Sequence, residues 1–96
     1  MRLNELRDQA HFNAKLKGFH DTKRDVGKAL MLVVTELSEA LEADREGDDD
    51  LFREEIADAF IRLGDLCGEY RIDIEKEVNR KMKINAGRPA LHNKKY

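Results

Sequence analysis

The 96-residue sequence has no tryptophan and one proline, and aromatic residues make up 6% of it. No apolar run approaches the roughly 18 residues that a bilayer-spanning helix needs, and the first residues, MRLNELRDQAHF, lack the apolar stretch of a signal peptide. The single cysteine, Cys67, cannot form an internal disulfide and falls among apolar positions. These absences predict a cytoplasmic protein with a plain thiol in its core.

The residues that are present favour helices. Charged residues make up 40% of the sequence, which is rich in leucine, alanine, glutamate, lysine and arginine, all of them good helix formers. We therefore expect an all-α fold in a single domain over residues 1–96. A chain of this size buries only about 60–65% of the surface of its unfolded form, so its own core would be thin.

Apolar spacing and capping residues predict four helices. Gly47 is placed to end the second helix in a left-handed conformation, and Asp48, Asp49 and Asp50 to cap and charge the start of the third. Residues 85–96, which contain glycine, proline and several cations, are expected to form a basic irregular tail. The first expected helix runs from Leu3 to Leu16, and the second from about Lys23 to Glu46 after a cap at Asp21 or Thr22. The third begins at residues 48–50 and ends at Leu66 or Glu69. The fourth runs from about Ile74 to Ile84 after a cap at Asp73.

The second helix is apolar nearly all round in its middle, which is typical of a helix buried on more than one side. The chain has too few helices to cover it, so we expect an antiparallel four-helix, bundle-like protomer that is completed by homo-oligomerisation, most simply as a two-fold dimer. The predicted apolar stripe of this helix is Val26, Leu30, Val33, Leu37, Ala40 and Leu41, and the predicted inward side of the third helix is Phe52, Ile56, Ala59, Phe60, Leu63, Leu66 and Cys67.

The stretch from Thr35 to Phe60 has eleven acids against two cations, a net charge of −9. Within it Glu36 and Glu39, and likewise Glu55 and Asp58, are spaced i, i+3, which places each pair on one side of a helix. Both pairs are also symmetric about Gly47: Glu39 and Glu55 are eight residues from it, and Glu36 and Asp58 are eleven. An antiparallel hairpin turning at Gly47 would bring the two pairs level.

Electrostatic repulsion destabilises such a cluster of carboxylates, because two like charges ~4 Å apart repel by roughly 4 kcal/mol at an effective dielectric of 20. A bound cation would relieve the repulsion, and carboxylate oxygens suit Mg²⁺, with Mn²⁺ as a substitute. No histidine lies at ligand spacing within these helices, which argues against zinc and di-iron sites. The alternative is a solvated acidic surface that Arg53 or Arg62 partly neutralises.

The end of the chain has the opposite charge: residues 76–96 contain seven cations and one acid, a net charge of +6. Lys81 and Asn85 are i, i+4 on the last predicted helix and Arg88 follows it, so three donors for phosphate can converge there. The alternative is a basic tail that solubilises the chain or neutralises the acidic groove of a neighbour.

The order TELSE, EEIADAFIRL, RIDIEKEV and KMKINAGRP resembles the MazG-like family of all-α nucleoside triphosphate pyrophosphohydrolases over about residues 26–92, and HFNAKLKGFHD resembles the lead-in of its small members. The resemblance implies Mg²⁺-dependent hydrolysis of a (deoxy)nucleoside triphosphate to the monophosphate and pyrophosphate.

Two positions depart from the family pattern: Thr35 stands where a further glutamate is common, and His20 where an aromatic residue could stack on the base. Phe12 and Phe19 remain as stacking candidates, with a core role favoured for Phe12. The roles implied are metal binding for Glu36, Glu39, Glu55 and Asp58, proton transfer for Glu39 or Glu55, and substrate binding for Lys81, Asn85 and Arg88.

Two other classes of function fit parts of the pattern. A helical interaction or regulatory module could bind a partner protein in the acidic groove. A nucleic-acid binder could use the basic tail, although the net charge of −2 and the lack of interleaved aromatics argue against it. The sequence leaves open the preferred base and sugar, the number of metal ions, dimer versus tetramer, and removal of unwanted nucleotides versus control of a nucleotide pool.

Overall fold

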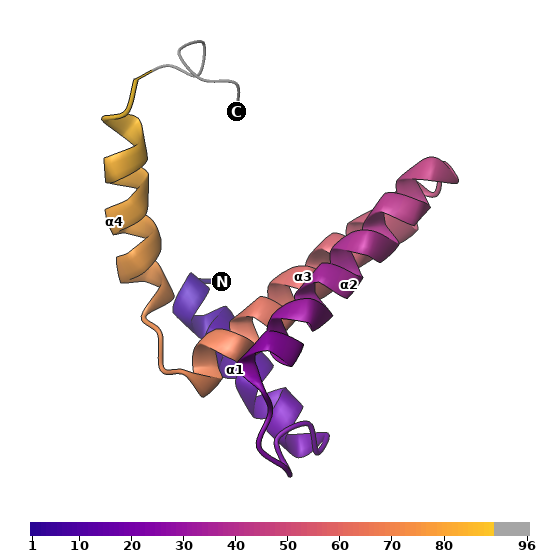
Figure 1. The fold of residues 1–96 in the computed structure, drawn as a ribbon, viewed down its shortest axis with the longest axis horizontal. Coiled ribbons are helices and arrows are strands. Elements are labelled where there is room, and N and C mark those ends of the chain that lie inside the picture. The colour runs from indigo at the N-terminus through magenta and orange to yellow at the C-terminus, as the bar shows by residue number, and fades with distance from the viewer. Residues whose placement is uncertain (90–96) are drawn as a thin grey trace.

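A computed structural model of the chain describes residues 1–89, which form four α-helices and no strand (Figure 1). The all-α prediction is therefore confirmed. Within these residues no helix combines the length and the apolar character needed to cross a membrane. Of the predicted irregular tail, residues 85 and 86 still belong to the last helix, and residues 90–96 lie outside the described part of the chain. The helices are α1 (Leu3–Leu16), α2 (Val26–Arg45), α3 (Asp49–Glu69) and α4 (Ile74–Ala86).

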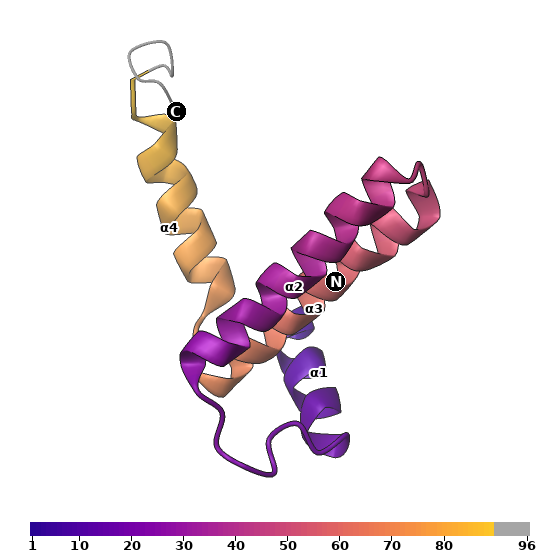
Figure 2. The same cartoon turned by 45° about the vertical axis from the view of Figure 1, so that its right-hand side comes forward.

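The turn between α2 and α3 has the predicted chemistry. Gly47 adopts a left-handed φ of 73°, and the Asp48 amide donates back to the Ala43 carbonyl at 2.9 Å, as in a Schellman motif. The Asp48 carboxylate then caps α3 by accepting from the Leu51 amide at 3.0 Å. With only residues 46–48 between the helices, α2 and α3 fold back on each other as an antiparallel hairpin, which both views show side by side (Figures 1 and 2).

The predicted start of α2 was wrong. Asp25, not Asp21 or Thr22, caps this helix, and its carboxylate accepts from the Gly27 amide. In the segment before this cap, His20 and Arg24 extend their side chains to acids on α3. The cap predicted for α4 is confirmed, since Asp73 accepts from the Lys76 amide at 3.1 Å.

Helix α1 packs closely against α3, and two glycines of α3 make the approach possible. A Cβ atom added to Gly68 would lie 2.5 Å from the Cβ of His11, and one added to Gly64 would lie 3.4 Å from the Cβ of Ala10. Helix α4 contacts α1 near its own start and then projects away from the hairpin (Figures 1 and 2). The Cα radius of gyration, 15.8 Å, exceeds the value of about 12 Å expected for a compact chain of this length.

The apolar core is thin and made of small side chains. Leu66 is the one large residue among the buried apolar residues of the described chain, and the others are alanines. Several residues predicted to face inward are exposed in the single chain, because α4 diverges and leaves this side of the hairpin uncovered. The buried apolar residues are Ala10, Ala14, Ala29, Ala40, Ala43, Ala59 and Leu66, and the exposed residues of the predicted core are Val26, Leu30, Leu37, Leu41, Phe52, Phe60 and Leu63.

Candidate functional site

The hairpin brings together three of the four predicted metal ligands. Glu36 and Glu39 come from α2 and Glu55 from α3, and one carboxylate oxygen from each lies within 4.8 Å of the others. This follows from the turn at Gly47, which pairs the two helices in the predicted register. Asp58, one turn after Glu55 on α3, is exposed and does not belong to this group of atoms.

Glu36 is the buried member of the group, with 7% of its surface exposed. Its Oε1 accepts a hydrogen bond of 2.7 Å from Arg62 Nε on α3. This guanidinium lowers the pKa of Glu36 below its ordinary value of 4.5, so the carboxylate stays ionised at neutral pH. Arg62 thus neutralises part of the cluster, as one of the two sequence-based interpretations expected.

Glu55 differs from Glu36 both in its hydrogen bonding and in the direction of its pKa shift. Its Oε2 atom is buried and has no hydrogen-bond partner among the described residues. When it is protonated, Glu55 can donate to the carboxylate of Glu36 and then to that of Glu39, and this, together with burial and repulsion by the same two acids, raises the pKa of Glu55 to about 7. A buried carboxylate oxygen without a donor is a costly arrangement, and a hard cation beside two further carboxylates would supply its missing partner. The three residues therefore fit Mg²⁺ or Mn²⁺.

The acidic group opens onto a groove of about 300 Å³ on one side of the hairpin. Glu39 and Glu55 contribute to its wall, whereas Arg62 lines a smaller pocket of about 90 Å³ between α1 and α3. Because Arg62 also binds Glu36, the small pocket adjoins the acidic group. The groove is lined by Ser38, Glu39, Glu42, Ala43, Glu46, Leu51 and Glu55, and the small pocket by Ala10, Asn13, Ala14, Lys17, Phe19, Ile61, Arg62 and Asp65.

The two phenylalanines considered for base stacking differ in position. Phe19 lines the small pocket beside Arg62. Phe12 is 61% exposed, so the core role favoured for it was wrong, and it borders a separate cavity on the other side of α1 with Arg7, Lys15 and Arg71. At the first departure from the family pattern, the Thr35 hydroxyl donates to the Met31 carbonyl of its own helix at 3.0 Å.

The three predicted substrate-binding residues do not reach the acidic group of their own chain. Lys81 and Asn85 lie on α4, Arg88 follows that helix, and all three are exposed. None of them lines the acidic groove or the small pocket. Helix α4 leads them away from the hairpin (Figure 2).

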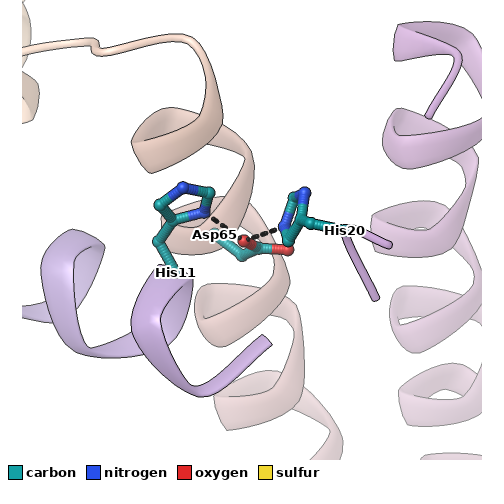
Figure 3. A group of neighbouring side chains, drawn as sticks. All are labelled: His11, His20 and Asp65. Atoms are coloured by element: carbon teal, nitrogen blue, oxygen red, sulfur yellow. Dashed lines mark hydrogen bonds and ion pairs between the residues drawn. The ribbon is translucent and has the colours of Figure 1, made fainter. Parts of the chain in front are cut away.

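A second polar cluster was missed in the sequence. Asp65, 5% exposed on α3, accepts hydrogen bonds on Oδ1 from His11 Nδ1 at 2.8 Å and from His20 Nε2 at 2.7 Å (Figure 3). Its Oδ2 lies 3.1 Å from a guanidinium nitrogen of Arg24, which also donates to Glu69 at 2.7 Å. The cluster joins α1, the loop at 17–25 and α3 in one network.

The imidazoles and the carboxylate of this cluster are ligand types that zinc accepts. However, two ligand atoms bound to zinc at about 2.0–2.1 Å in tetrahedral geometry lie roughly 3.4 Å apart, whereas the contacts to Asp65 are 2.7 and 2.8 Å long. They are direct hydrogen bonds, and Arg24 already compensates the charge of Asp65. The network therefore accounts for these residues without an ion. Its only sequence signal is the helical glycine at position 68, which marks the close approach of His11.

Comparisons of this chain with models of protein families, with curated proteins and with solved structures find no match. The resemblance to MazG-like enzymes therefore depends on the residues themselves.

Proposed function

We propose that this protein is a Mg²⁺-dependent nucleoside triphosphate pyrophosphohydrolase of the MazG-like type, which converts a (deoxy)nucleoside triphosphate to the monophosphate and pyrophosphate. The observation that carries the proposal is the meeting of Glu36, Glu39 and Glu55 across the hairpin, with the unpartnered Oε2 atom of Glu55 buried among them. An acidic surface built only for solubility has no reason to bury a carboxylate oxygen without a donor.

In this proposal Glu36, Glu39 and Glu55 would hold the metal, with Asp58 reaching the site from the next turn of α3. Bound Mg²⁺, or Mn²⁺ in its place, would neutralise charge on the triphosphate and lower the pKa of a coordinated water. The fixed pairing of Arg62 with Glu36 positions one ligand and leaves Glu39 and Glu55 as the adaptable members of the group.

Proton transfer is assigned to Glu55 or Glu39. A general base works best when its pKa is near the working pH, and the pKa of Glu55 is about 7. This pKa is that of the metal-free protein, and a bound cation would lower it, so in the loaded site Glu55 is ionised and free to accept a proton from the attacking water. Glu39, which is exposed in the same groove, is the second candidate.

Nucleotide contacts are assigned to two regions. Lys81, Asn85 and Arg88 provide a point charge, an amide and a two-pronged donor for phosphate oxygens. The small pocket beside Arg62 offers Phe19 as a stacking surface for the base. The expected reducing compartment, the cytoplasm, belongs to the same proposal.

The test is pyrophosphate release from each common ribo- and deoxyribonucleoside triphosphate with Mg²⁺. We expect release from at least one of them, and a loss of about 100-fold or more in kcat for Glu39→Gln and Glu55→Gln. Glu54→Gln is the matched control, because Glu54 precedes Glu55 on α3 but is exposed, and it should keep wild-type turnover within about twofold. Absence of pyrophosphate with every nucleotide, together with absence of metal-dependent stabilisation, would reject the proposal.

The second candidate is a non-catalytic helical interaction or regulatory module. The uncovered apolar side of the hairpin favours it, since exposed apolar patches commonly mark interaction surfaces. The same assay separates the two, because a module of this kind releases no pyrophosphate.

A further inference from the structure

A cavity of about 360 Å³, larger than the acidic groove or the small pocket, lies between α1 and the turn that joins α3 to α4. It uses a different side of α1 from the small pocket: positions 7, 8, 11, 12 and 15 line this cavity, and positions 10, 13, 14 and 17 line the pocket. Its volume falls at the lower end of the range of about 300–1,000 Å³ that is typical of small-molecule sites.

The charge of this cavity is positive, and it is therefore named the basic cavity. Its lining includes three cations, Arg7, Lys15 and Arg71, and one acid, Asp8. Arg7 and Asp8 form an ion pair of 2.8 Å, whereas Lys15 and Arg71 are exposed and form no ion pair within residues 1–89. The two unpaired cations leave a net charge of +2. This matches a phosphate monoester, which carries close to two negative charges at neutral pH.

Arg7 is held in a fixed position at the edge of the basic cavity. Its side chain is 20% exposed. Its Nε donates to Asp8 at 2.8 Å, and its Nη1 donates to the Ile72 carbonyl, in the turn after α3, at 2.9 Å. These bonds leave Nη2 for a ligand. Because the guanidinium is already ordered, it would lose little side-chain entropy on binding an anion.

Arg71 has a backbone conformation that an arginine rarely adopts. Its φ is 55°, and no other residue of the described chain except glycine has a positive φ. The Arg71 and Ile72 amides donate back into the last turn of α3, at 3.3 and 2.9 Å. This is a Schellman motif, in which the left-handed residue is usually glycine, as Gly47 is after α2. Strained residues of this kind cluster at functional sites.

Compensation of the α3 dipole does not require a cation at Arg71. A basic side chain in the last turn of α3 would interact with the dipole equally well and would need no left-handed backbone. That turn has no basic residue. What position 71 adds is its place in the wall of the basic cavity.

Phe12 gives the basic cavity an aromatic side. It is 61% exposed and lies three residues before Lys15 in the same wall. A single exposed phenylalanine is ordinary, but beside unpaired cations it offers a surface on which a flat group can stack. His11 lines the cavity from the direction of the histidine network, with its Nδ1 engaged by Asp65 (Figure 3).

We propose that the basic cavity binds a small molecule in which a phosphate dianion adjoins a flat apolar group. Arg7, Lys15 and Arg71 contact the phosphate, with the arginines as fork-shaped donors and the lysine as a point charge. Phe12 packs against the flat group. The site shares no residue with the acidic group, so it does not depend on the proposed hydrolysis.

The first test compares phenyl phosphate, inorganic phosphate and benzoate by titration calorimetry, in buffer freed of divalent metals. We expect phenyl phosphate to bind with a Kd of about 1 mM or tighter. It should bind about two- to tenfold more tightly than inorganic phosphate, because the ring adds an aromatic contact, and benzoate, with one charge, should bind more weakly than phenyl phosphate. No binding of phenyl phosphate at about 10 mM, or equal affinity for the two phosphates, would overturn the proposal.

The second test removes one cation at a time. Arg71→Gly and Lys15→Gln should each weaken phenyl phosphate binding about fivefold or more. Arg71→Gly should keep or raise the melting temperature, because glycine adopts a positive φ without strain, so its loss of binding would not reflect unfolding. Arg53→Gln is the matched control, since Arg53 is exposed on α3 and does not line the cavity, and its affinity should stay within about twofold. Unchanged binding in Arg71→Gly, or equal weakening in Arg53→Gln, would overturn the proposal.

The third test locates the ligand. In ¹⁵N-labelled protein, phenyl phosphate should shift the amide signals of Lys15, Gly68 and Arg71, and not those of Glu39 and Glu55 in the acidic groove. Phe12→Leu should keep the affinity for inorganic phosphate and bring the preference for phenyl phosphate close to one. Shifts confined to the acidic groove, or an unchanged preference in Phe12→Leu, would overturn the proposal, whether or not the protein hydrolyses nucleotides.

Discussion

Arg62 Nε lies 2.7 Å from Glu36 Oε1 and joins the buried carboxylate of α2 to the facing turn of α3. One guanidinium does not neutralise the acidic group of Glu36, Glu39 and Glu55, which keeps a net negative charge. Once Glu55 has lost its proton, three carboxylates and one guanidinium give −3 + 1 = −2, which equals in magnitude the charge of one divalent cation. With this balance the acidic group can hold an internal ion pair and still accommodate the metal that we propose.

Arg62→Gln tests the ion pair. Without the guanidinium, Glu36 remains buried beside two acids, so we expect the metal-free protein to lose about 1–3 kcal/mol of unfolding free energy. The lower part of this range is favoured because the Arg62 side chain is 35% exposed and its charge is screened by solvent. The measurement is urea unfolding followed by circular dichroism, since the chain has no tryptophan.

The matched control is Arg45→Gln, which removes an arginine whose partner, Glu42, is well exposed on the same helix. We expect a change within about 0.5 kcal/mol. Saturating Mg²⁺ should recover part of the stability lost in the Arg62 variant and none of the small change in the Arg45 variant. Equal losses in both variants would contradict a special role for the Arg62–Glu36 pair.

Metal affinity should depend on pH through Glu55. Its pKa is about 7 in the folded, metal-free protein against an ordinary 4.5, so between these pH values the folded state binds the extra proton. Stability from this group is therefore fully present below pH 4.5 and is lost as pH rises to about 7. A metal needs the ionised form, so we expect Mg²⁺ affinity measured by calorimetry to rise about tenfold from pH 6 to pH 8. Glu55→Gln should bind more weakly and without this rise; a flat wild-type profile would contradict the assignment.

Asp65→Asn tests the histidine network. The amide keeps the shape of the carboxylate but removes the charge that faces Arg24, and it cannot serve His11 and His20 equally well. We expect a loss of about 1–3 kcal/mol, because the amide leaves one of the part-buried imidazoles without its carboxylate acceptor, whereas Arg24 keeps Glu69 as a partner. Asp44→Asn, at an exposed position of α2, should change stability by no more than about 0.5 kcal/mol. A similarly small effect at Asp65 would show that the network does not hold α1 and the loop against α3.

Much of the fold could be predicted from local signals. Apolar spacing gave the bounds of α1, and Gly47 with the aspartates after it placed the turn between α2 and α3, because these features depend on neighbours within a few residues. The meeting of Glu36, Glu39 and Glu55 followed from the same turn, since an antiparallel hairpin fixes which residues lie level. Local periodicity was sufficient for these contacts.

The remaining features depend on tertiary packing, which spacing does not reveal. The apolar stripes were identified, but the buried contacts within the chain are mostly alanines, because close helix approach selects small side chains. His20 lies in a loop without periodicity, so its meeting with Asp65 could not be expected. The direction of α4 depends on its contact with α1, which the 13 residues of α4 do not encode by themselves.

The last prediction joins the proposed hydrolysis to the homodimer that the apolar second helix leads us to expect. If α4 lies on the partner's hairpin, Lys81 serves the acidic group of the other chain, so Glu39→Gln and Lys81→Ala damage different halves of one site. Each variant alone should be nearly inactive at substrate concentrations below the wild-type KM. After the two are unfolded and refolded together in equal amounts, half of the dimers are mixed and each of these has one intact site, which predicts about a quarter of wild-type activity. Recovery should increase with the fraction of mixed dimers measured by mass spectrometry. A mixture that only averages its two parents would place Lys81 in the site of its own chain, whereas an inactive wild-type protein would reject the hydrolase proposal.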